Sequence, residues 1–196
     1  MDAEARKMVG NLRLVLLGPP GSGKGTQAER LAKTFQVSWI STGEMLRQAV
    51  VADGELGQRI AGILRSGNLV DDATMAEVVS ERLTQPDVEA GFILDGFPRT
   101  ISQADTLSRI LREAGETLTC VLSIDVPEKE LVKRILGRNR ADDREIVIQN
   151  RLAVYREKTE PLIEYYKGFG LLQSINGDQP MDAVTEEMTA KLAVAV

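Results

Sequence analysis

A glycine-rich segment near the start of the chain has the composition of a loop that binds phosphate groups. Residues 18–26 read Gly-Pro-Pro-Gly-Ser-Gly-Lys-Gly-Thr and match the pattern G-x-x-x-x-G-K. Glycines let consecutive backbone N–H groups turn toward an anion, because no Cβ stands in the way. Lys24 adds a point charge on a flexible stem, which suits the β- and γ-phosphates of a nucleotide. The segment therefore predicts a polyphosphate site.

The residues on either side of this loop predict the strand and the helix that it requires. Residues 12–17 are apolar except for Arg13, as in a buried strand. The apolar face of the following helix repeats at i, i+3, i+4 and i+7, at Ala28, Leu31, Ala32 and Phe35. A helix that begins at the loop adds its own partial positive charge toward an anion. Gly25 departs from the motif, because Ser or Thr usually follows the lysine.

Composition excludes several kinds of chemistry. The chain has 196 residues, 43% of them hydrophobic, and fits one globular domain. It has no histidine, which excludes histidine-based triads and histidine-ligated zinc. Its single cysteine, Cys120, cannot form an internal disulfide or a four-cysteine zinc site. The net charge is −5, so a polyphosphate site would need a local concentration of cations.

The same composition favours a cytoplasmic protein. No run approaches the roughly 18 apolar residues of a membrane span. Residues 1–10 carry acids and bases and lack the apolar stretch of a signal peptide. We expect Cys120, Trp39 and the three tyrosines at 155, 165 and 166 to serve packing.

Strand-like and helix-like segments alternate along the rest of the chain. Further β-like runs lie at residues 37–40, 92–95, 119–126 and 171–175. This alternation predicts a three-layer α/β unit, with a parallel five-stranded sheet and helices on both faces. Asp71 or Asp72 is expected to cap a helix through Leu83, and Pro161 to bend a helix that runs to about residue 167. Glycines at 54, 57, 62 and 67 divide residues 41–70 into short helical pieces and predict an excursion outside the core.

Charged and polar side chains follow the predicted strands. Asp95 ends one of them, at the edge where doubly wound sheets bind ligands, and could hold Mg²⁺ or its waters; a plain cap is the alternative. Arg99 and Gln103 are four residues apart, so one turn of helix would direct both to the same site. Arg134 and Arg138 have the same spacing and predict one cationic face.

Four segments together resemble the signature of adenylate kinases, nucleoside monophosphate kinases of the P-loop class. They are residues 18–27 (GPPGSGKGTQ), 41–47 (STGEMLR), 94–100 (LDGFPRT) and 140–143 (RADD). The resemblance covers residues 12–175 and implies a P-loop NTPase-type fold. It also accounts for Gly25, because this family uses Lys-Gly-Thr at the end of the loop.

The resemblance implies two nucleotide sites. The ATP site would comprise Gly21, Ser22, Gly23, Lys24, Gly25, Thr26, Arg134, Arg138 and Gln179. The AMP site would comprise Thr42, Arg47, Asn68, Leu69, Val70, Gly96, Arg99, Gln103, Arg140 and Arg151. Catalytic roles would fall to Lys24, Arg99, Arg138, Arg140 and Arg151.

It also implies how the chain is divided. Residues 1–196 would form a single kinase domain, with a core of residues 1–40, 71–137 and 144–196. Residues 41–70 would be a small AMP-binding arm, and residues 138–143 a very short lid, because only Asn139 separates Arg138 from Arg140. Zinc, which some family members carry in a longer lid, is excluded by the lack of cysteine and histidine ligands.

The implied reaction is reversible phosphoryl transfer from MgATP to AMP, giving two ADP, with Mg²⁺ as the cofactor. Its partners would be ATP, AMP and ADP, with no nucleic acid or membrane, and we expect a monomer. A UMP or CMP kinase is the close alternative, disfavoured by Thr42 and Gln103, which suit an adenine base. A P-loop regulator is a third reading, disfavoured because no Asn-Lys-x-Asp guanine motif occurs.

Overall fold

The computed structural model describes residues 12–52, 54–137 and 145–195. Its centre is a five-stranded sheet in the order β2-β3-β1-β4-β5, and every pairing is parallel. The strands are β1 Leu12–Leu17, β2 Ser38–Ser41, β3 Gly91–Asp95, β4 Cys120–Asp125 and β5 Leu172–Asn176. The predicted parallel sheet is confirmed, and the strand boundaries agree with the sequence to within one or two residues.

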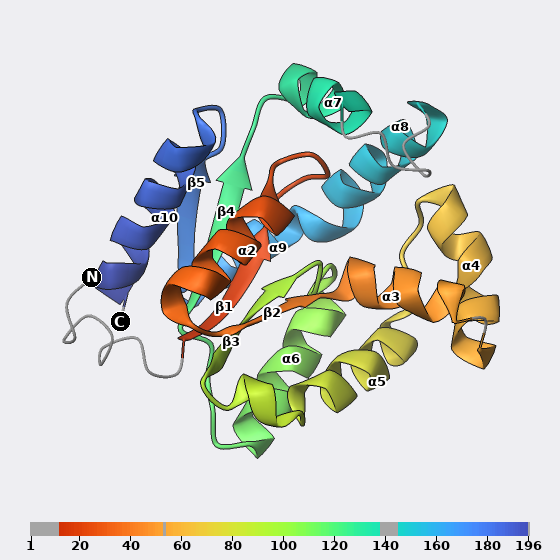
Figure 1. Ribbon diagram of the computed structural model, residues 1–196, viewed down its shortest axis with the longest axis horizontal. Helices are drawn as coiled ribbons and strands as arrows, with labels where there is room; N and C mark the ends of the chain where they lie inside the picture. Colours follow the sequence, from red (N-terminus) through yellow and green to blue (C-terminus); the bar gives the residue numbers. More distant parts are fainter. Residues whose placement is uncertain (1–11, 53, 138–144, 196) are drawn as a thin grey trace.

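Helices cover the sheet on both faces (Figure 1). They are α2 Lys24–Phe35, α3 Thr42–Val51, α4 Glu55–Ser66, α5 Asp72–Leu83, α6 Ile101–Glu113, α7 Glu128–Gly137, α8 Glu145–Val154, α9 Pro161–Gly168 and α10 Met181–Ala195. No helix in the described part of the chain is long and apolar enough to cross a membrane. The three-layer α/β arrangement matches the expectation from the alternating sequence pattern.

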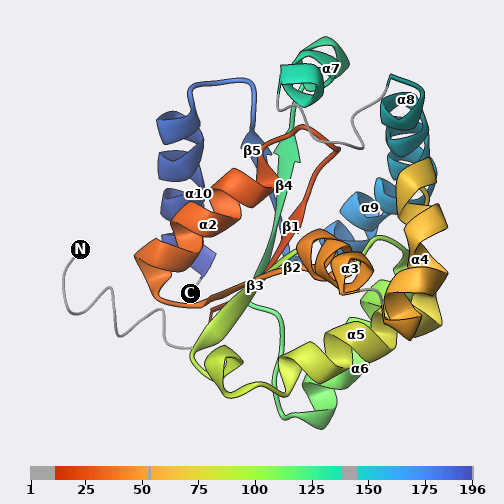
Figure 2. The same cartoon turned by 45° about the vertical axis from the view of Figure 1, so that its right-hand side comes forward.

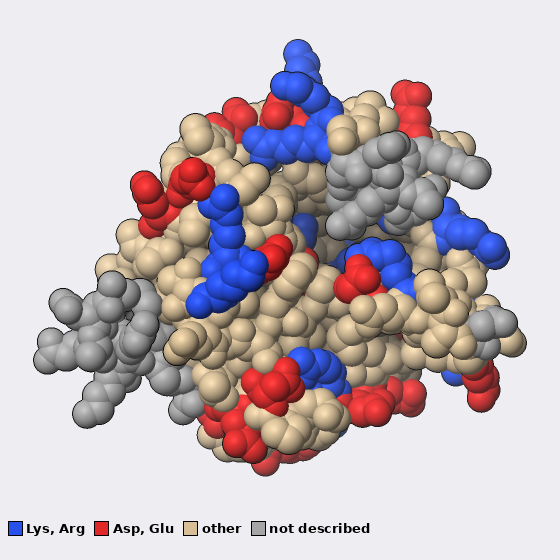
Figure 3. Space-filling view, in the orientation of Figure 1, with Lys and Arg blue, Asp and Glu red and all other residues tan. Residues whose placement is uncertain are grey.

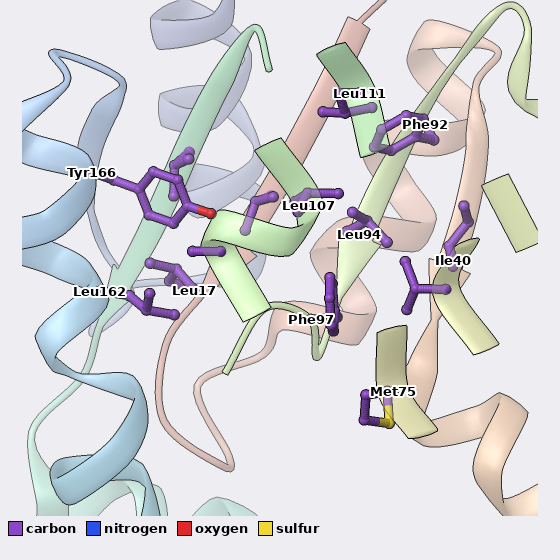
Figure 4. Close-up of a cluster of buried hydrophobic side chains, with 14 of the residues drawn as sticks. Leu17, Ile40, Met75, Phe92, Leu94, Phe97, Leu107, Leu111, Leu162 and Tyr166 are labelled. Carbon is purple, nitrogen blue, oxygen red and sulfur yellow. The ribbon is translucent and has the colours of Figure 1, made fainter. Parts of the chain in front are cut away.

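The two faces of the sheet carry separate hydrophobic layers. On one face α2 and α10 contribute Leu31 and Met188 to a cluster with β1 and β4. On the other face α5, α6 and α9 pack over the sheet, and this larger cluster includes Leu107, Leu162 and Tyr166 (Figure 4). Because both faces of β1 are covered, every residue of that strand is buried.

Arg13 and Cys120 are among the polar or reactive side chains buried within the sheet. Arg13 in β1 is 7% exposed and forms an ion pair with Glu116 at 2.5 Å, which compensates the buried charge. Cys120 begins β4, and burial raises the pKa of its thiol to about 11. The thiol is therefore protonated near neutral pH and packs as a small apolar group, as expected.

The helix that follows α8 contains a local change of hydrogen-bond register. Residues Tyr155–Thr159 form a π-helical segment, and the Glu160 N–H donates to the Tyr155 carbonyl at 2.9 Å, five residues back. Pro161 explains the change, because proline has no N–H and its ring clashes with the carbonyl four residues earlier. The predicted bend at Pro161 thus takes the form of a π-bulge.

Residues 41–70 differ from the expectation that they lie outside the core. Leu46 and Ile60 are 6% and 2% exposed, and both belong to the larger hydrophobic cluster together with Val70. The segment contributes to the core because α3 and α4 pair closely and present one apolar face. A glycine makes this pairing possible: a Cβ on Gly57 would lie 2.1 Å from the Ala49 carbonyl oxygen.

We predict that Gly57→Ala lowers the free energy of unfolding by about 2 kcal/mol or more, because the added methyl group meets backbone and not a movable side chain. Gly62→Ala in the same helix is the matched control, since no atom lies within 4 Å of its added Cβ. This control should raise stability by about 0.5 to 1 kcal/mol through helix propensity. Urea unfolding of both variants tests the difference, and equal effects would contradict it.

Candidate functional site

The candidate site is a cleft of about 840 Å³ at the carboxyl edge of the sheet. The ends of β1, β2 and β3 meet there, because Leu16 and Ser41 both pair with Asp95. Chain order places β2 and β3 on one side of β1 and β4 and β5 on the other, so the cleft lies at the topological switch point. The space-filling view shows this hollow with basic side chains in its walls (Figure 3).

The glycine loop between β1 and α2 forms one wall of the cleft. Gly18, Gly21 and Gly23 have φ angles of 144°, 85° and 97°, a region that favours glycine. A Cβ on Gly18 would lie 2.9 Å from the Ile124 carbonyl, and one on Gly21 would lie 2.9 Å from the Leu131 carbonyl. The loop thus needs glycine both for its conformation and for its close packing. It ends at the first turn of α2, whose N–H groups lie at the cleft.

Lys24 is the first residue of α2, and its side chain reaches back to the start of the glycine loop. Its Nζ donates to the carbonyl oxygens of Gly18 at 2.6 Å and Pro19 at 3.0 Å. These carbonyls hold the ammonium group at the mouth of the loop, where the backbone N–H groups and the helix end also lie. The structure therefore concentrates positive charge at one point of this wall.

Three arginines gather at the opposite wall. Arg99 follows β3, and its Nε donates to the Gly96 carbonyl at 2.8 Å. Burial lowers the pKa of the Arg99 guanidinium and Asp95 raises it, while the positive charges of Arg151 and Arg47 lower it further. Arginine stays cationic in spite of such shifts, so three positive charges are held within interaction range. This unfavourable concentration of like charge is typical of a phosphate site.

Gly96 allows the end of β3 to approach its neighbours closely. Its φ is 90°, and an added Cβ would lie 2.7 Å from Thr42 Oγ1 and 3.1 Å from Arg99 Nη2. The Thr42 hydroxyl donates to the Asp95 carbonyl at 3.3 Å, and Thr42 is 1% exposed. The glycine therefore brings the hydroxyl and the guanidinium to the same corner of the cleft.

Gln103 and Arg99 line the same cleft, as predicted, but the prediction that one turn of helix joins them is wrong. Helix α6 begins at Ile101 with Thr100 as its N-cap, so Arg99 precedes the helix. The two residues meet instead through a hydrogen bond from the Arg99 N–H to Gln103 Oε1 at 2.8 Å. Gln103 Nε2 donates to Asp72 Oδ1 at 2.7 Å. The side chain is 2% exposed and is held from both ends of its amide.

A second polar group lies beyond the glycine loop, near α7 and the turn after β5. Arg134 Nη1 donates to the Gly177 carbonyl at 3.0 Å, and its Nε to Glu130 at 3.1 Å. Gln179 Nε2 donates to Glu187 at 2.8 Å, which anchors this turn to α10. Arg134 and Gln179 both line the cleft.

Helix α8 and the end of α4 close the cleft on its far side, where they lie side by side (Figure 2). Asn150 Nδ2 donates to the Ser66 carbonyl at 2.8 Å and to Asn68 Oδ1 at 3.0 Å. A Cβ on Gly67 would lie 3.0 Å from Arg151 Cγ, so glycine permits this contact. Arg151 is thereby placed beside residues 68–70.

One cleft brings together the described residues that the sequence assigned to the two sites. Its walls include Gly21, Ser22, Gly23, Lys24, Gly25, Thr26, Thr42, Arg47, Asn68, Leu69, Val70, Asp95, Gly96, Arg99, Gln103, Arg134, Arg151 and Gln179. Arg138 and Arg140 lie outside the described residues, as does the whole segment 138–143 assigned to the lid.

Sequence reasoning missed several residues of the cleft. Trp39, 39% exposed, and Tyr155 both line it, although packing was expected of them. Burial raises the pKa of the Tyr155 hydroxyl, and Glu160 and Asp125 add to the shift. Thr159 also lines the cleft, and its hydroxyl donates to the Arg99 carbonyl at 3.0 Å. Pro161 could have indicated this part of the cleft. A proline inside a helix disturbs the hydrogen bonds of the preceding turn, and the π-bulges that result often occur at functional sites.

Comparison with known proteins decides which family this geometry belongs to. The family model "Adenylate kinase" matches residues 16–171. This chain belongs to the adenylate kinase family. The chain is therefore a kinase, and the resemblance read from its four motifs is confirmed.

Several relatives in this family match most of the chain. Adenylate kinase 1 of Synechocystis sp. is 46% identical over 175 residues, which cover 89% of this chain and 94% of the relative. Adenylate kinase of Mycobacteroides abscessus is 48% identical over 173 residues, covering 88% and 94%. Adenylate kinase of Stenotrophomonas maltophilia is 43% identical over 185 residues, covering 92% and 99%. A UMP or CMP kinase is not favoured by these matches.

We predict that Thr159→Val lowers the free energy of unfolding by about 1 kcal/mol, because it leaves the Arg99 carbonyl without its donor. Thr159→Ser keeps the hydroxyl and serves as the control, expected to lie closer to the unaltered protein. Urea unfolding measures both variants. Equal losses for valine and serine would show that the hydroxyl does not stabilise this contact.

Proposed function

We propose that this protein transfers the terminal phosphoryl group of ATP to AMP, reversibly, giving two ADP. The observation that supports this best is the pair of cationic walls that face each other across one cleft. Lys24 and the glycine loop form one wall, and Arg47, Arg99 and Arg151 contribute to the other. A site for a single polyphosphate needs only the first wall. Two separate cationic walls suit a reaction between two phosphorylated substrates.

The glycine-loop wall would bind ATP. Backbone N–H groups of residues 21–26 and Lys24 would contact its phosphates, as the loop geometry favours. Arg134 and Gln179 would lie beside its adenine, where Glu130 and Glu187 hold their side chains in place. Arg138 would contact the same phosphates.

The opposite wall would bind AMP. Arg47 and Arg99 would contact its phosphate, with Arg140 and Arg151 between the phosphoryl groups of both nucleotides. The Thr42 hydroxyl and the Gln103 amide offer the polar contacts that an adenine base needs, and residues 68–70 and Gly96 would complete its pocket. Residues 41–70 would act as the AMP-binding arm and residues 138–143 as the lid.

The reaction needs no histidine or other general base. A phosphate monoester has a second pKa of about 6, so the attacking oxygen of AMP is already deprotonated near neutral pH. The difficulty is electrostatic, because two polyanions must meet in line and the moving phosphoryl group must be stabilised. Lys24, Arg99, Arg138, Arg140 and Arg151 would supply that stabilisation. Closure of the arm and lid would exclude water and so limit hydrolysis of ATP.

Asp95 has the position and the chemistry for Mg²⁺. Its Oδ2 lies 3.5 Å from where a Cβ on Gly25 would be, so the carboxylate reaches the base of the glycine loop. In the described part of the chain no three His, Cys, Asp or Glu side chains group as a metal site, so the nucleotide would supply further ligands. This fits Mg²⁺, which commonly binds through one or two carboxylates, water and substrate phosphates. When bound, the ion would neutralise phosphate charge, with Asp95 acting through water.

We also propose that the enzyme works as a monomer in the cytoplasm on small-molecule nucleotides. The one cysteine is a buried thiol, which suits a reducing compartment. Size-exclusion chromatography with light scattering tests the oligomeric state, and a dimer at micromolar concentration would contradict it.

A coupled assay with fixed MgATP and a panel of AMP, UMP and CMP tests the function. We expect AMP to be the best acceptor, and a compound joining two adenosines through five phosphates to inhibit at low concentration. Higher kcat/KM with UMP or CMP would favour the pyrimidine alternative. Slow ATP hydrolysis without transfer to any monophosphate would favour a nucleotide-binding regulator.

We predict that Lys24→Met lowers kcat by about 100-fold or more, because it removes a cation from the transferring phosphoryl group. Lys33→Met is the matched control: Lys33 is an exposed lysine in the same helix, paired with Glu29, and its loss should leave turnover nearly unchanged. Trp39 is the one tryptophan of the chain and lines the cleft, so its emission can report nucleotide binding independently of turnover. A folded Lys24→Met protein with near-normal turnover would remove Lys24 from the mechanism.

A further inference from the structure

The amide of Gln103 has only one orientation that its neighbours allow. The Arg99 backbone N–H can only donate, and it meets Gln103 Oε1 at 2.8 Å. The Asp72 carboxylate can only accept, and its Oδ1 meets Gln103 Nε2 at 2.7 Å. A flipped amide would place its NH₂ group against the N–H and its carbonyl against the carboxylate. Both contacts would become repulsive, so the two partners lock the amide from opposite ends.

Asp72 is held in turn by the elements that meet at this point. It is the first residue of α5, and the Thr100 hydroxyl donates to its carboxylate at 3.1 Å. Thr100 is the N-cap of α6, and its oxygen accepts from the Gln103 N–H at 3.1 Å. The carboxylate therefore belongs to a network that joins the starts of two helices, and it does not line the cleft itself.

The locked amide offers the cleft a defined hydrogen-bond pattern. A primary amide has two N–H donors and two acceptor lone pairs, and one of each is used by Asp72 and Arg99. One donor on Nε2 and one acceptor on Oε1 remain. A 6-aminopurine presents the matching edge, since its N1 accepts and its amino group donates. A 6-oxopurine presents the reverse edge, since its N1–H donates and its O6 accepts.

We propose that Asp72 is a positioning residue that makes the site selective for 6-aminopurine over 6-oxopurine monophosphates. It acts through Gln103, because a 6-oxopurine could pair with that amide only after the flip that Asp72 opposes. This inference rests on the proposed function, in which Gln103 contacts the base of the phosphoryl acceptor. A site that fixes its polar groups in this way rejects a mismatched analogue by leaving those groups unpaired.

The test compares kcat/KM for AMP and for inosine monophosphate at fixed MgATP. Asp72→Ala removes one of the two locks, and we expect KM for AMP to rise about tenfold and the AMP preference to fall about tenfold, with kcat for AMP little changed. Asp72→Asn keeps an acceptor oxygen but can rotate to follow a flipped amide. It should retain most of the affinity for AMP and still lose part of the preference.

Asp71→Ala is the matched control for a structural effect. Asp71 is the N-cap of α5 and accepts from the Thr74 N–H at 2.9 Å, whereas the hydrogen bonds described for Gln103 are to Arg99, Thr100 and Asp72. Its loss should lower the melting temperature and leave the ratio of AMP to inosine monophosphate unchanged. If Asp72→Ala behaves in the same way, with equal loss for both substrates, the inference is wrong. If Asp72→Ala does not fold, Asp72→Asn and equilibrium binding of the two monophosphates decide the question.

Two further measurements separate this inference from the function on which it rests. Absence of phosphoryl transfer to AMP by the unaltered protein would overturn the proposed function, and the inference with it. Gln103→Leu should reduce the AMP preference in an active enzyme. If Gln103→Leu reduces the preference and Asp72→Ala leaves it intact, Gln103 contacts the base as proposed, and only the proposed role of Asp72 is wrong. If Gln103→Leu has no effect on the preference, the amide does not read the base.

Discussion

The structure depends on holding several cations close together in one cleft. The chain carries a net charge of −5, yet Lys24, Arg47, Arg99 and Arg151 line one cleft. Local acceptors hold most of this charge in place: loop carbonyls for Lys24, Glu44 for Arg47 and the Gly96 carbonyl for Arg99. A guanidinium has five N–H donors, so Arg47 and Arg99 have more donors than these contacts use, and further N–H groups remain for phosphate oxygens. Positive charge is thereby arranged before any substrate binds, which is the basis of electrostatic preorganisation.

The sheet supports this arrangement of cations by supplying a rigid frame. Both faces of β1 are buried, so the loop that follows it starts from a fixed point. Parallel pairing brings the ends of β1, β2 and β3 to the same edge, because Leu16 and Ser41 share Asp95 as their partner. Glycines then remove the Cβ atoms that would separate the walls, at Gly18 and Gly21 in the loop and at Gly96 after β3. Stability in the two hydrophobic layers thus offsets the repulsion at the edge.

The elements beyond the sheet set the geometry of the second wall. Asn150 joins α8 to the end of α4, which brings Arg151 beside residues 68–70. The π-bulge before Pro161 directs Thr159 to the Arg99 carbonyl, so the helix that carries Arg151 also supports the loop that carries Arg99. Asp72 likewise holds the Gln103 amide in place by accepting a hydrogen bond from its Nε2. Contacts between helices, and not the helices themselves, decide where the polar groups point.

The sequence alone determined the parallel α/β sheet, the glycine loop and the family, because these are written in local patterns: buried runs, glycine positions and motif spacing. It also identified many of the residues that line the cleft, through the motifs and through the family resemblance that they carry. It could not show that Leu46 and Ile60 join the core, that Arg99 meets Gln103 through a cap, or that Trp39 and Tyr155 face the cleft. Asp72 likewise has no motif that connects it to Gln103. Only the tertiary structure decided these points, because each depends on contacts between segments far apart in the chain. The geometry of a hydrogen bond depends on the partner that folding brings within reach.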